Sequence, residues 1–127
     1  MTNPTDRRYA TTHEWAMPDG DTITVGVSMF AVEQLTEPTF LELKKVGLTV
    51  KVGDEVGIIE SVKSTSSIYA PVAGEIVAVN KAAVDNLSLV NDDPFATGWL
   101  VKIKPTAGAT LDHLLTATQY DAQIAGH

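Results

Sequence analysis

The chain has 127 residues, of which 44% are hydrophobic and 20% are charged, and this composition suits one domain with a single core. The net charge of −7 disfavours binding to nucleic acid and to an anionic membrane surface, and the lack of cysteine excludes disulfides, thiolate metal sites and a cysteine nucleophile. Residues 1–9 are polar, and no stretch approaches the roughly 18 apolar residues of a membrane helix. We therefore expect a cytoplasmic protein that does not enter the membrane.

Short strands dominate the first half of the chain. Apolar side chains alternate with Thr and Gly over residues 22–27, which predicts a half-buried strand after the Pro18-Asp19-Gly20 turn. Ser28 is expected to cap a short helix over residues 28–35. Glycine-containing turns separate two further strands, which are expected at residues 39–43 and 49–52.

The second half of the chain continues this pattern. Residues 55–62 are apolar and β-branched, and the strand resumes at 68–70 after a small polar segment, so the two predict a hairpin with Lys63 at or beside its tip. Later strands are expected at residues 75–80 and 99–105. Leu111, Leu114 and Leu115 predict a short helix over 110–118, whereas residues 82–89 are interpreted as a loop or one helical turn.

Two similar segments lie on either side of Lys63 and suggest a repeated unit. Glu55-Val56 follows Gly53-Asp54, and Glu75-Ile76 follows Ala73-Gly74. This arrangement fits a small barrel or sandwich whose halves are related by a pseudo-twofold axis. Closure of short strands in this way also removes exposed sheet edges.

The usual signatures of an enzyme are missing. The three histidines, His13, His113 and His127, are far apart in sequence, and there is no Gly-x-Ser-x-Gly nucleophile motif. The acidic residues do not have a calcium-loop spacing, and Lys63 does not follow a glycine-rich phosphate loop. We therefore expect neither catalysis nor a metal site.

Lys63 is the residue that suggests a function. A single lysine in a turn is usually a solvated surface residue. The neighbours of Lys63, however, are small or β-branched, in the sequence Glu60-Ser61-Val62-Lys63-Ser64. A primary amine that projects from such a rigid turn is a suitable attachment point for an acyl cofactor.

From Tyr9 to about Tyr120 the chain resembles the H protein of the glycine cleavage system, a lipoyl carrier. A biotin carrier would instead need methionines on both sides of the lysine. The residues that carry the resemblance are His13-Glu14-Trp15, Gly26-Val27, Phe30-Ala31, Glu42-Leu43, Val46-Gly47, Glu60-Ser61-Val62-Lys63, Ala70-Pro71-Val72-Ala73-Gly74-Glu75, Leu89-Val90-Asn91-Asp92-Asp93-Pro94, Gly98-Trp99-Leu100 and Ile103-Lys104-Pro105.

The resemblance implies a mostly β fold, a flattened barrel-sandwich hybrid with short peripheral and C-terminal helices. Residues 1–127 would form a single lipoyl-carrier domain, with its core at about 9–120. Lipoic acid would be attached covalently to Lys63 within Glu60–Ser64, and this swinging arm would shuttle an aminomethyl intermediate. The implied partners are a lipoate ligase or lipoyl transferase, glycine decarboxylase, aminomethyltransferase and dihydrolipoamide dehydrogenase. The carrier would be a monomer and would not itself catalyse a reaction.

The resemblance also implies a cleft for the loaded arm. An aminomethyl group bound to sulfur is labile in water and cationic when protonated, so a cleft that excludes water and offers a carboxylate would protect it. Thr12, Glu14 and Ser67 occupy the matching positions. The family usually has an acid at the position of Ser67, so this chain lacks one counter-charge there.

This departure leaves a second function open. An H-protein-like lipoate-binding protein could carry a sulfur-containing intermediate for a heterodisulfide-reductase-like complex in sulfur oxidation. A neutral or anionic sulfur cargo would not require an acid at position 67. Attachment through Lys63 is common to both functions, and they differ in the cargo.

Overall fold

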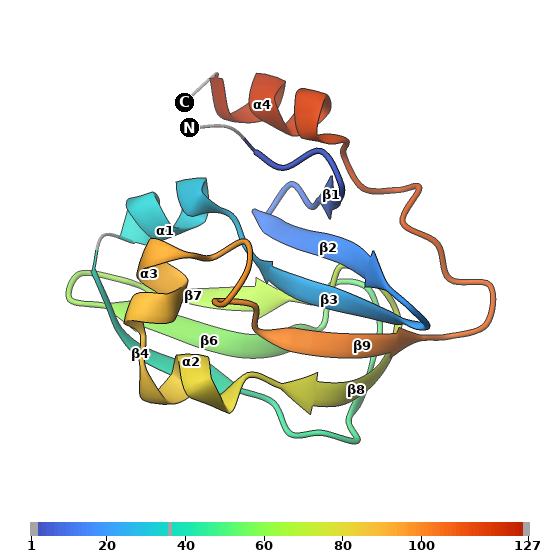
Figure 1. Cartoon of the computed structure of the whole chain (residues 1–127), viewed down its shortest axis with the longest axis horizontal. Helices are drawn as coiled ribbons and strands as arrows, with labels where there is room; N and C mark the ends of the chain where they lie inside the picture. The colour runs from blue at the N-terminus through green and yellow to red at the C-terminus, as the bar shows by residue number, and fades with distance from the viewer. Residues whose placement is uncertain (1–2, 36, 126–127) are drawn as a thin grey trace.

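A computed structural model describes residues 3–35 and 37–125, so His127 lies outside the described residues. The described chain forms a six-stranded sheet in the order β1-β2-β3-β9-β8-β5 and a three-stranded sheet in the order β4-β6-β7 (Figure 1). The strands are β1 Arg8–Tyr9, β2 Glu14–Asp19, β3 Thr22–Val27, β4 Pro38–Leu43, β5 Thr49–Val50, β6 Glu55–Ser61, β7 Thr65–Tyr69, β8 Gly74–Val79 and β9 Val101–Pro105.

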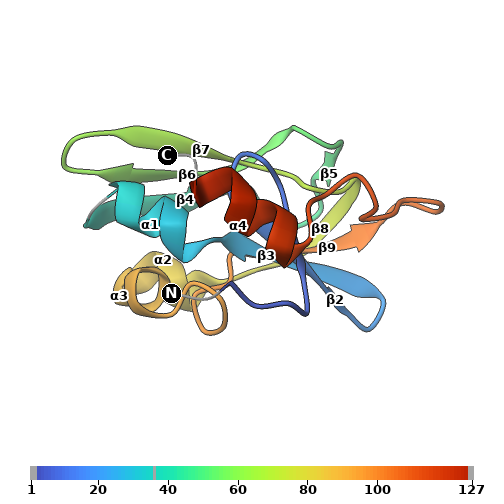
Figure 2. The same ribbon diagram turned by 90° about the horizontal axis from the view of Figure 1, so that it is seen from above.

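Short helices lie at the ends of these sheets. They are α1 Met29–Leu35, α2 Lys81–Asp85, α3 Ser88–Asp92 and α4 Ala117–Ala125. In Figure 2 the β6–β7 hairpin extends past α1 at one end of the molecule, and α4 lies in front of the sheets. The predicted flattened barrel-sandwich hybrid is confirmed.

The core lies between the two sheets and has a satellite beneath α4. The main cluster includes the fully buried residues Val25 and Ile103 of the larger sheet and Val56 and Ile59 of the smaller one. The satellite contains four buried residues: Tyr9, Trp15, Ala117 and Tyr120. The chain ends are therefore joined to the β-sandwich by their own aromatic packing.

Gly26 allows β2 to lie closely on β3. A Cβ atom at this position would come within 2.5 Å of Trp15 Cζ2, which is closer than carbon atoms approach without a clash. The Trp15 indole fills this space, and its Nε1 donates to the carbonyl oxygens of Val27 and Pro94, both at 3.1 Å. This packing fixes the register of the strand that begins at Glu14.

Two expectations for the strands and helices need correction. The strand at 22–27 is not half-buried, because consecutive residues of a strand point to opposite faces and residues 23–27 are all buried, so both faces of β3 are covered. The predicted helix over 110–118 is wrong. Tyr9 and Leu115 exchange backbone hydrogen bonds of 2.7 and 2.8 Å, so Leu115 is extended beside β1.

The helix that the structure contains begins at Ala117. The Thr116 hydroxyl accepts from the Gln119 amide at 3.2 Å, and the Gln119 side chain accepts from the Thr116 amide at 2.9 Å. This is a capping box, and Thr-x-x-Gln was its signal in the sequence. The ambiguous segment 82–89 forms most of α2 and the start of α3, and the Asn80 side chain caps α2.

Candidate functional site

The β6–β7 hairpin presents Lys63 to solvent. Within its turn the Ser61 amide donates to the Ser64 carbonyl at 2.8 Å, and Val62 and Lys63 occupy the two central positions. Val62 is 85% exposed and Lys63 is also exposed. The ion pairs of the described residues use other basic side chains, so the Lys63 amine is accessible to a modifying enzyme.

Polar contacts below the tip hold the turn together. The Ser64 amide donates to Ser61 Oγ at 3.3 Å, and the Thr65 hydroxyl donates to Glu60 Oε1 at 3.3 Å. Glu60 and Thr65 are also cross-strand partners in the β6–β7 ladder. Glu60, Ser61 and Ser64, which the sequence predicted to belong to the attachment site, are therefore arranged as supports on either side of the lysine.

Glu14 is buried at the first position of β2. It is only 1% exposed, and its Oε2 accepts from the Tyr69 amide at 3.1 Å while its Oε1 accepts from the Thr12 hydroxyl. Burial raises the pKa of Glu14 to about 7, although the hydrogen bonds from Thr12 and Tyr69 favour the carboxylate. Glu14 is thus a desolvated acid that titrates near neutrality, and not a solvated turn residue.

A tight turn brings Thr12 and Glu14 into position. The Ala10 amide donates to the Glu14 carbonyl at 2.8 Å, and the His13 amide donates to the Ala10 carbonyl at 2.9 Å. His13 has a φ of +83°, in the left-handed region that is uncommon for a residue with a side chain. Local backbone strain therefore accompanies the placement of the acid.

A cavity of about 220 Å³ runs beside β7 from the lysine hairpin to Glu14. Its walls come from the Thr12–Glu14 turn, from α1, and from β6 and β7. The lining residues are Thr12, His13, Glu14, Val27, Ala31, Gln34, Leu35, Ile59, Ser64, Thr65, Ser66, Ser67 and Ile68. The three residues predicted for the arm cleft thus lie on one cavity, which begins beside Lys63.

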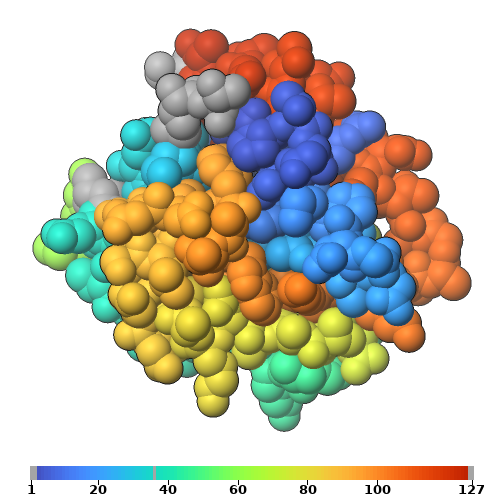
Figure 3. All heavy atoms as spheres, in the orientation of Figure 1, coloured from blue at the N-terminus to red at the C-terminus, as the bar shows by residue number. Residues whose placement is uncertain are grey.

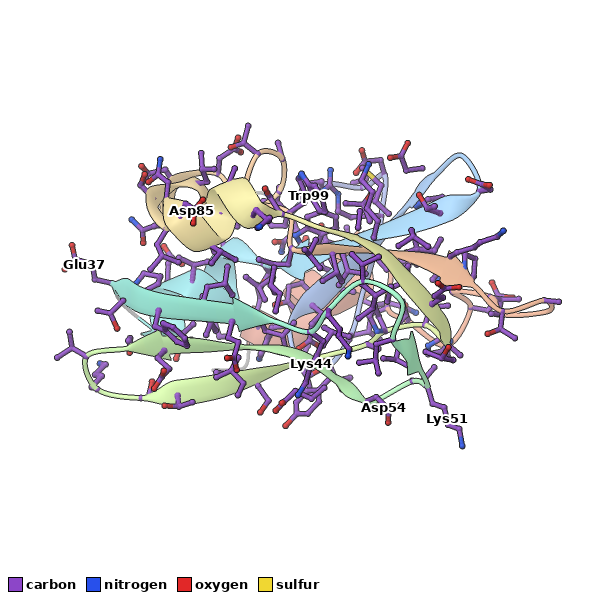
Figure 4. The ribbon with its side chains drawn as sticks, turned by 90° about the horizontal axis from the view of Figure 1, so that it is seen from below. Glu37, Lys44, Lys51, Asp54, Asp85 and Trp99 are labelled. Atoms are coloured by element: carbon purple, nitrogen blue, oxygen red, sulfur yellow. The ribbon has the colours of Figure 1, made fainter. Side chains whose placement is uncertain are left out.

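Ser67 also has a partner that the sequence did not reveal. Its hydroxyl donates to Glu55 Oε1 at 2.8 Å, and Glu55 Oε2 is 3.5 Å from the Nζ of Lys44, which is labelled in Figure 4. The buried residue Ile68 follows Ser67 in β7, so alternation directs the Ser67 side chain to the opposite face from Ile68. A carboxylate therefore lies next to position 67 although the residue there is serine.

A second cavity, of about 380 Å³, shares Glu14 with the first. Thr12 and Glu14 line both cavities, and the second also includes Tyr69, Pro71 and His113. The Nε2 of His113 donates to the Pro71 carbonyl at 2.8 Å, so this histidine has a structural contact. No group of three or more His, Asp or Glu side chains in the described residues is arranged to hold a metal ion.

Comparisons with known proteins identify the family. Residues 7–127 match the family model described as Glycine cleavage H-protein. The chain belongs to the glycine cleavage H-protein family. It is 49% identical over 122 residues to the probable glycine cleavage system H protein of Natronomonas pharaonis, covering 96% of each chain. It is 48% identical over 120 residues to the glycine cleavage system H protein of Thermus thermophilus, covering 94% of each.

The fold agrees with a solved member of the family. The crystal structure of the glycine cleavage system H protein from Mycobacterium marinum superimposes with a TM-score of 0.88 at 40% identity, covering 97% of this chain and 99% of that one. Proteins of this family are lipoyl carriers of the glycine cleavage system and not catalysts, and they carry lipoic acid covalently on a lysine. The relatives do not favour the alternative function in sulfur oxidation.

None of the described helices is long and apolar enough to cross a membrane.

Proposed function

We propose that Lys63 is the lysine that carries the lipoyl group, and that the cavity ending at Glu14 receives the loaded arm. The observation that carries the proposal is the position of an exposed lysine in the hairpin turn, directly before Ser64, which lines this cavity. An amide at Nζ removes the positive charge of the lysine, so the arm enters the cavity without an ammonium group of its own to desolvate. When bound, lipoic acid supplies a disulfide that accepts the aminomethyl group.

The dimensions support this assignment. Tyr69, whose amide contacts Glu14, lies five residues beyond Ser64, which corresponds to roughly 16 Å along an extended strand. A lipoyl-lysine has about a dozen single bonds between Cα and the nearer sulfur, or roughly 15 Å when extended. An arm that starts at Lys63, one residue before Ser64, and folds back along β7 therefore covers most of the distance to the Glu14 carboxylate.

The chemistry of the cleft suits a small cation. Glu14 accepts two hydrogen bonds and is shielded from water, so an ammonium group placed beside it would lower its pKa and form a charge-assisted contact. Thr12 orients the carboxylate from the opposite side. The supporting residues of the attachment turn are Glu60, Ser61, Val62 and Ser64, and Ser67 borders the cleft with its link to Glu55.

The partners of the carrier belong to the glycine cleavage system. In our proposal a lipoate ligase or lipoyl transferase modifies Lys63, glycine decarboxylase loads the arm, aminomethyltransferase unloads it, and dihydrolipoamide dehydrogenase reoxidises the dithiol. The exposed hairpin supports this sequence of encounters, because each active site must reach the same arm. A single-domain monomer and a cytoplasmic location also stay predictions.

The test is loading with a defined cargo. Lipoylated protein in its disulfide form is incubated with glycine and glycine decarboxylase, and the aminomethyl group is located by peptide mass spectrometry. We expect it on the Lys63 peptide. Loading at another lysine, or no loading of a fully lipoylated protein by an active decarboxylase, would refute the assignment.

A further inference from the structure

The hydroxyl of Tyr120 joins two walls of the arm cleft from behind. It is hydrogen-bonded to His13 Nδ1 at 2.7 Å and to Ser28 Oγ at 2.7 Å. His13 belongs to the turn that carries Thr12 and Glu14, and Ser28 Oγ accepts from the Ala31 amide at the start of α1. One side-chain oxygen therefore connects the turn and the helix between which the cavity opens.

The helix that carries Tyr120 has a second contact with the same turn. Gln123 donates from Nε2 to the Thr11 carbonyl at 3.0 Å. Figure 3 shows the residues of α4 packed beside the N-terminal segment on one surface of the molecule. Within the described residues, α4 thus contacts the Thr11–Glu14 turn at two points, the His13 side chain and the Thr11 carbonyl oxygen.

The turn needs such support because its backbone is strained. His13 adopts a left-handed φ of +83°, which persists in a protein only when the surroundings enforce it. The His13 ring packs on Phe30 of α1 with a centroid distance of 4.9 Å, and on the edge of Tyr120 at 5.7 Å. These contacts and the hydrogen bond together keep the turn in the conformation that aims Glu14 at β7.

We propose that Tyr120 is a positioning residue of the arm cleft: its hydroxyl fixes the Thr12–Glu14 turn against α1 and so maintains the cavity that shields the cargo. The inference rests on the proposed function of that cavity. It adds a role for α4, which contributes none of the residues that line the cavity.

Tyr120→Phe tests the proposal, and Tyr9→Phe is a matched control. The two rings stack with centroids 4.7 Å apart, and both tyrosines are fully buried. The Tyr9 hydroxyl instead donates to the Pro4 carbonyl at 2.7 Å and does not contact the turn. Each variant keeps its ring and loses one buried hydroxyl, so a general loss of stability would affect both.

The first readout uses the protein before lipoylation. Hydrogen exchange of the Tyr69 amide reports the contact with Glu14. We expect Tyr120→Phe to accelerate this exchange by about fivefold, the effect of one ordinary hydrogen bond, and Tyr9→Phe to leave it unchanged. Equal acceleration of exchange in both variants would show that Tyr120 contributes only to general packing and would overturn the proposal.

The second readout uses the loaded carrier. We expect Tyr120→Phe to increase the spontaneous loss of the aminomethyl group, measured without aminomethyltransferase, by about fivefold. In a Glu14→Gln background Tyr120→Phe should have no further effect, because it acts through that carboxylate. Independent, multiplying effects would overturn the positioning role. If Glu14→Gln alone were without effect, the proposed cleft would itself be wrong, which separates the two failures.

Discussion

The hairpin tip and the Glu14 turn belong to one site but have opposite environments, because the tip is exposed and Glu14 is buried. At the tip, Lys63 is exposed and its neighbours interact mainly with one another, whereas Glu14 is buried and bonded both to Thr12 and to Tyr69, which is 55 residues away. The tip must be accessible to several enzymes, and the Glu14 turn must exclude water and hold the carboxylate in position. A carrier therefore needs an accessible attachment point and a rigid cleft, and the predictions below test the two separately.

The largest effect is expected at the tip. Lys63→Arg should abolish lipoylation, because a guanidinium group is not a nucleophilic amine at physiological pH. Unfolding free energy should change by less than about 0.5 kcal/mol, since the side chain is exposed. Intact-mass measurement after expression in a lipoylating host checks this, with the exposed Lys81→Arg as control. A lipoyl group that persists on the Lys63→Arg protein would contradict the assignment.

Glu14→Gln should leave lipoylation intact and weaken retention of the cargo. The glutamine side chain would keep an oxygen for the Tyr69 amide but lose the charge that pairs with an ammonium group. A charge-assisted contact contributes about 1.5–3 kcal/mol, so spontaneous loss of the aminomethyl group should accelerate roughly 10- to 100-fold. Timed mass spectrometry of the loaded protein measures the rate. Loss at the unaltered rate would show that Glu14 does not face the cargo.

Glu14 should also make folding stability depend on pH. Its pKa is about 7 in the folded protein and near 4.5 when unfolded, so the folded state binds more protons between these values. The free energy of unfolding should therefore fall by about 3 kcal/mol as pH rises from 4.5 to 7. Urea unfolding of the unmodified protein tests this. The fall attributable to Glu14 should be absent in Glu14→Gln, and identical pH profiles would refute the prediction.

A substitution at the base of the hairpin tests whether lipoylation depends on the stability of the hairpin or only on the exposure of Lys63. A Cβ at Gly57 in β6 would lie 2.7 Å from the Glu42 carbonyl oxygen, so Gly57→Ala should lower the free energy of unfolding by about 2 kcal/mol. Urea denaturation measures this change. Lipoylation at Lys63 should continue at about 25 °C if the tip requires only exposure. Loss of modification in a protein that is still folded would show that the modifying enzyme also reads the shape of the hairpin.

The smallest effect is expected at Ser67. Ser67→Ala removes the hydrogen bond to Glu55 and should lower the free energy of unfolding by about 0.5–1 kcal/mol. Because the hydroxyl is directed at Glu55, loss of the aminomethyl group, followed by the same timed mass spectrometry, should change less than about twofold. A larger change would place position 67 in contact with the cargo, as the acid usual in the family implies.

The Lys63 hairpin could be predicted from the sequence better than the turn of the buried Glu14, and the reason is physical. The β6–β7 hairpin depends on short-range alternation and turn residues, so its strands and Lys63 could be located from local pattern. The burial of Glu14 depends on a contact with Tyr69, 55 residues away, and only the family resemblance pointed to that acid. Tyr120 contacts His13 across 107 residues, and no local pattern marks such a pair.

The prediction of the C-terminal helix failed for a related reason. Leucines spaced three and four apart fit a helix over 110–118, but Leu115 completes a backbone bridge to Tyr9 and Leu114 is buried in the main core. Long-range pairing therefore outweighed local periodicity. The Thr116 capping box was a correct local signal for α4, and it marks the start of the helix seven residues later than predicted.

The strand that begins with Glu14 continues with Trp15, and alternation sends these neighbours to opposite faces. The indole is enclosed, with its nitrogen bonded to two carbonyl oxygens, so its fluorescence responds to small movements of β2. With Trp99 replaced by phenylalanine, Trp15 is the single tryptophan of the chain, and its emission reports on the strand position next to Glu14. We expect filling and emptying of the cleft to change this emission, which would follow the arm in real time without a label attached to it.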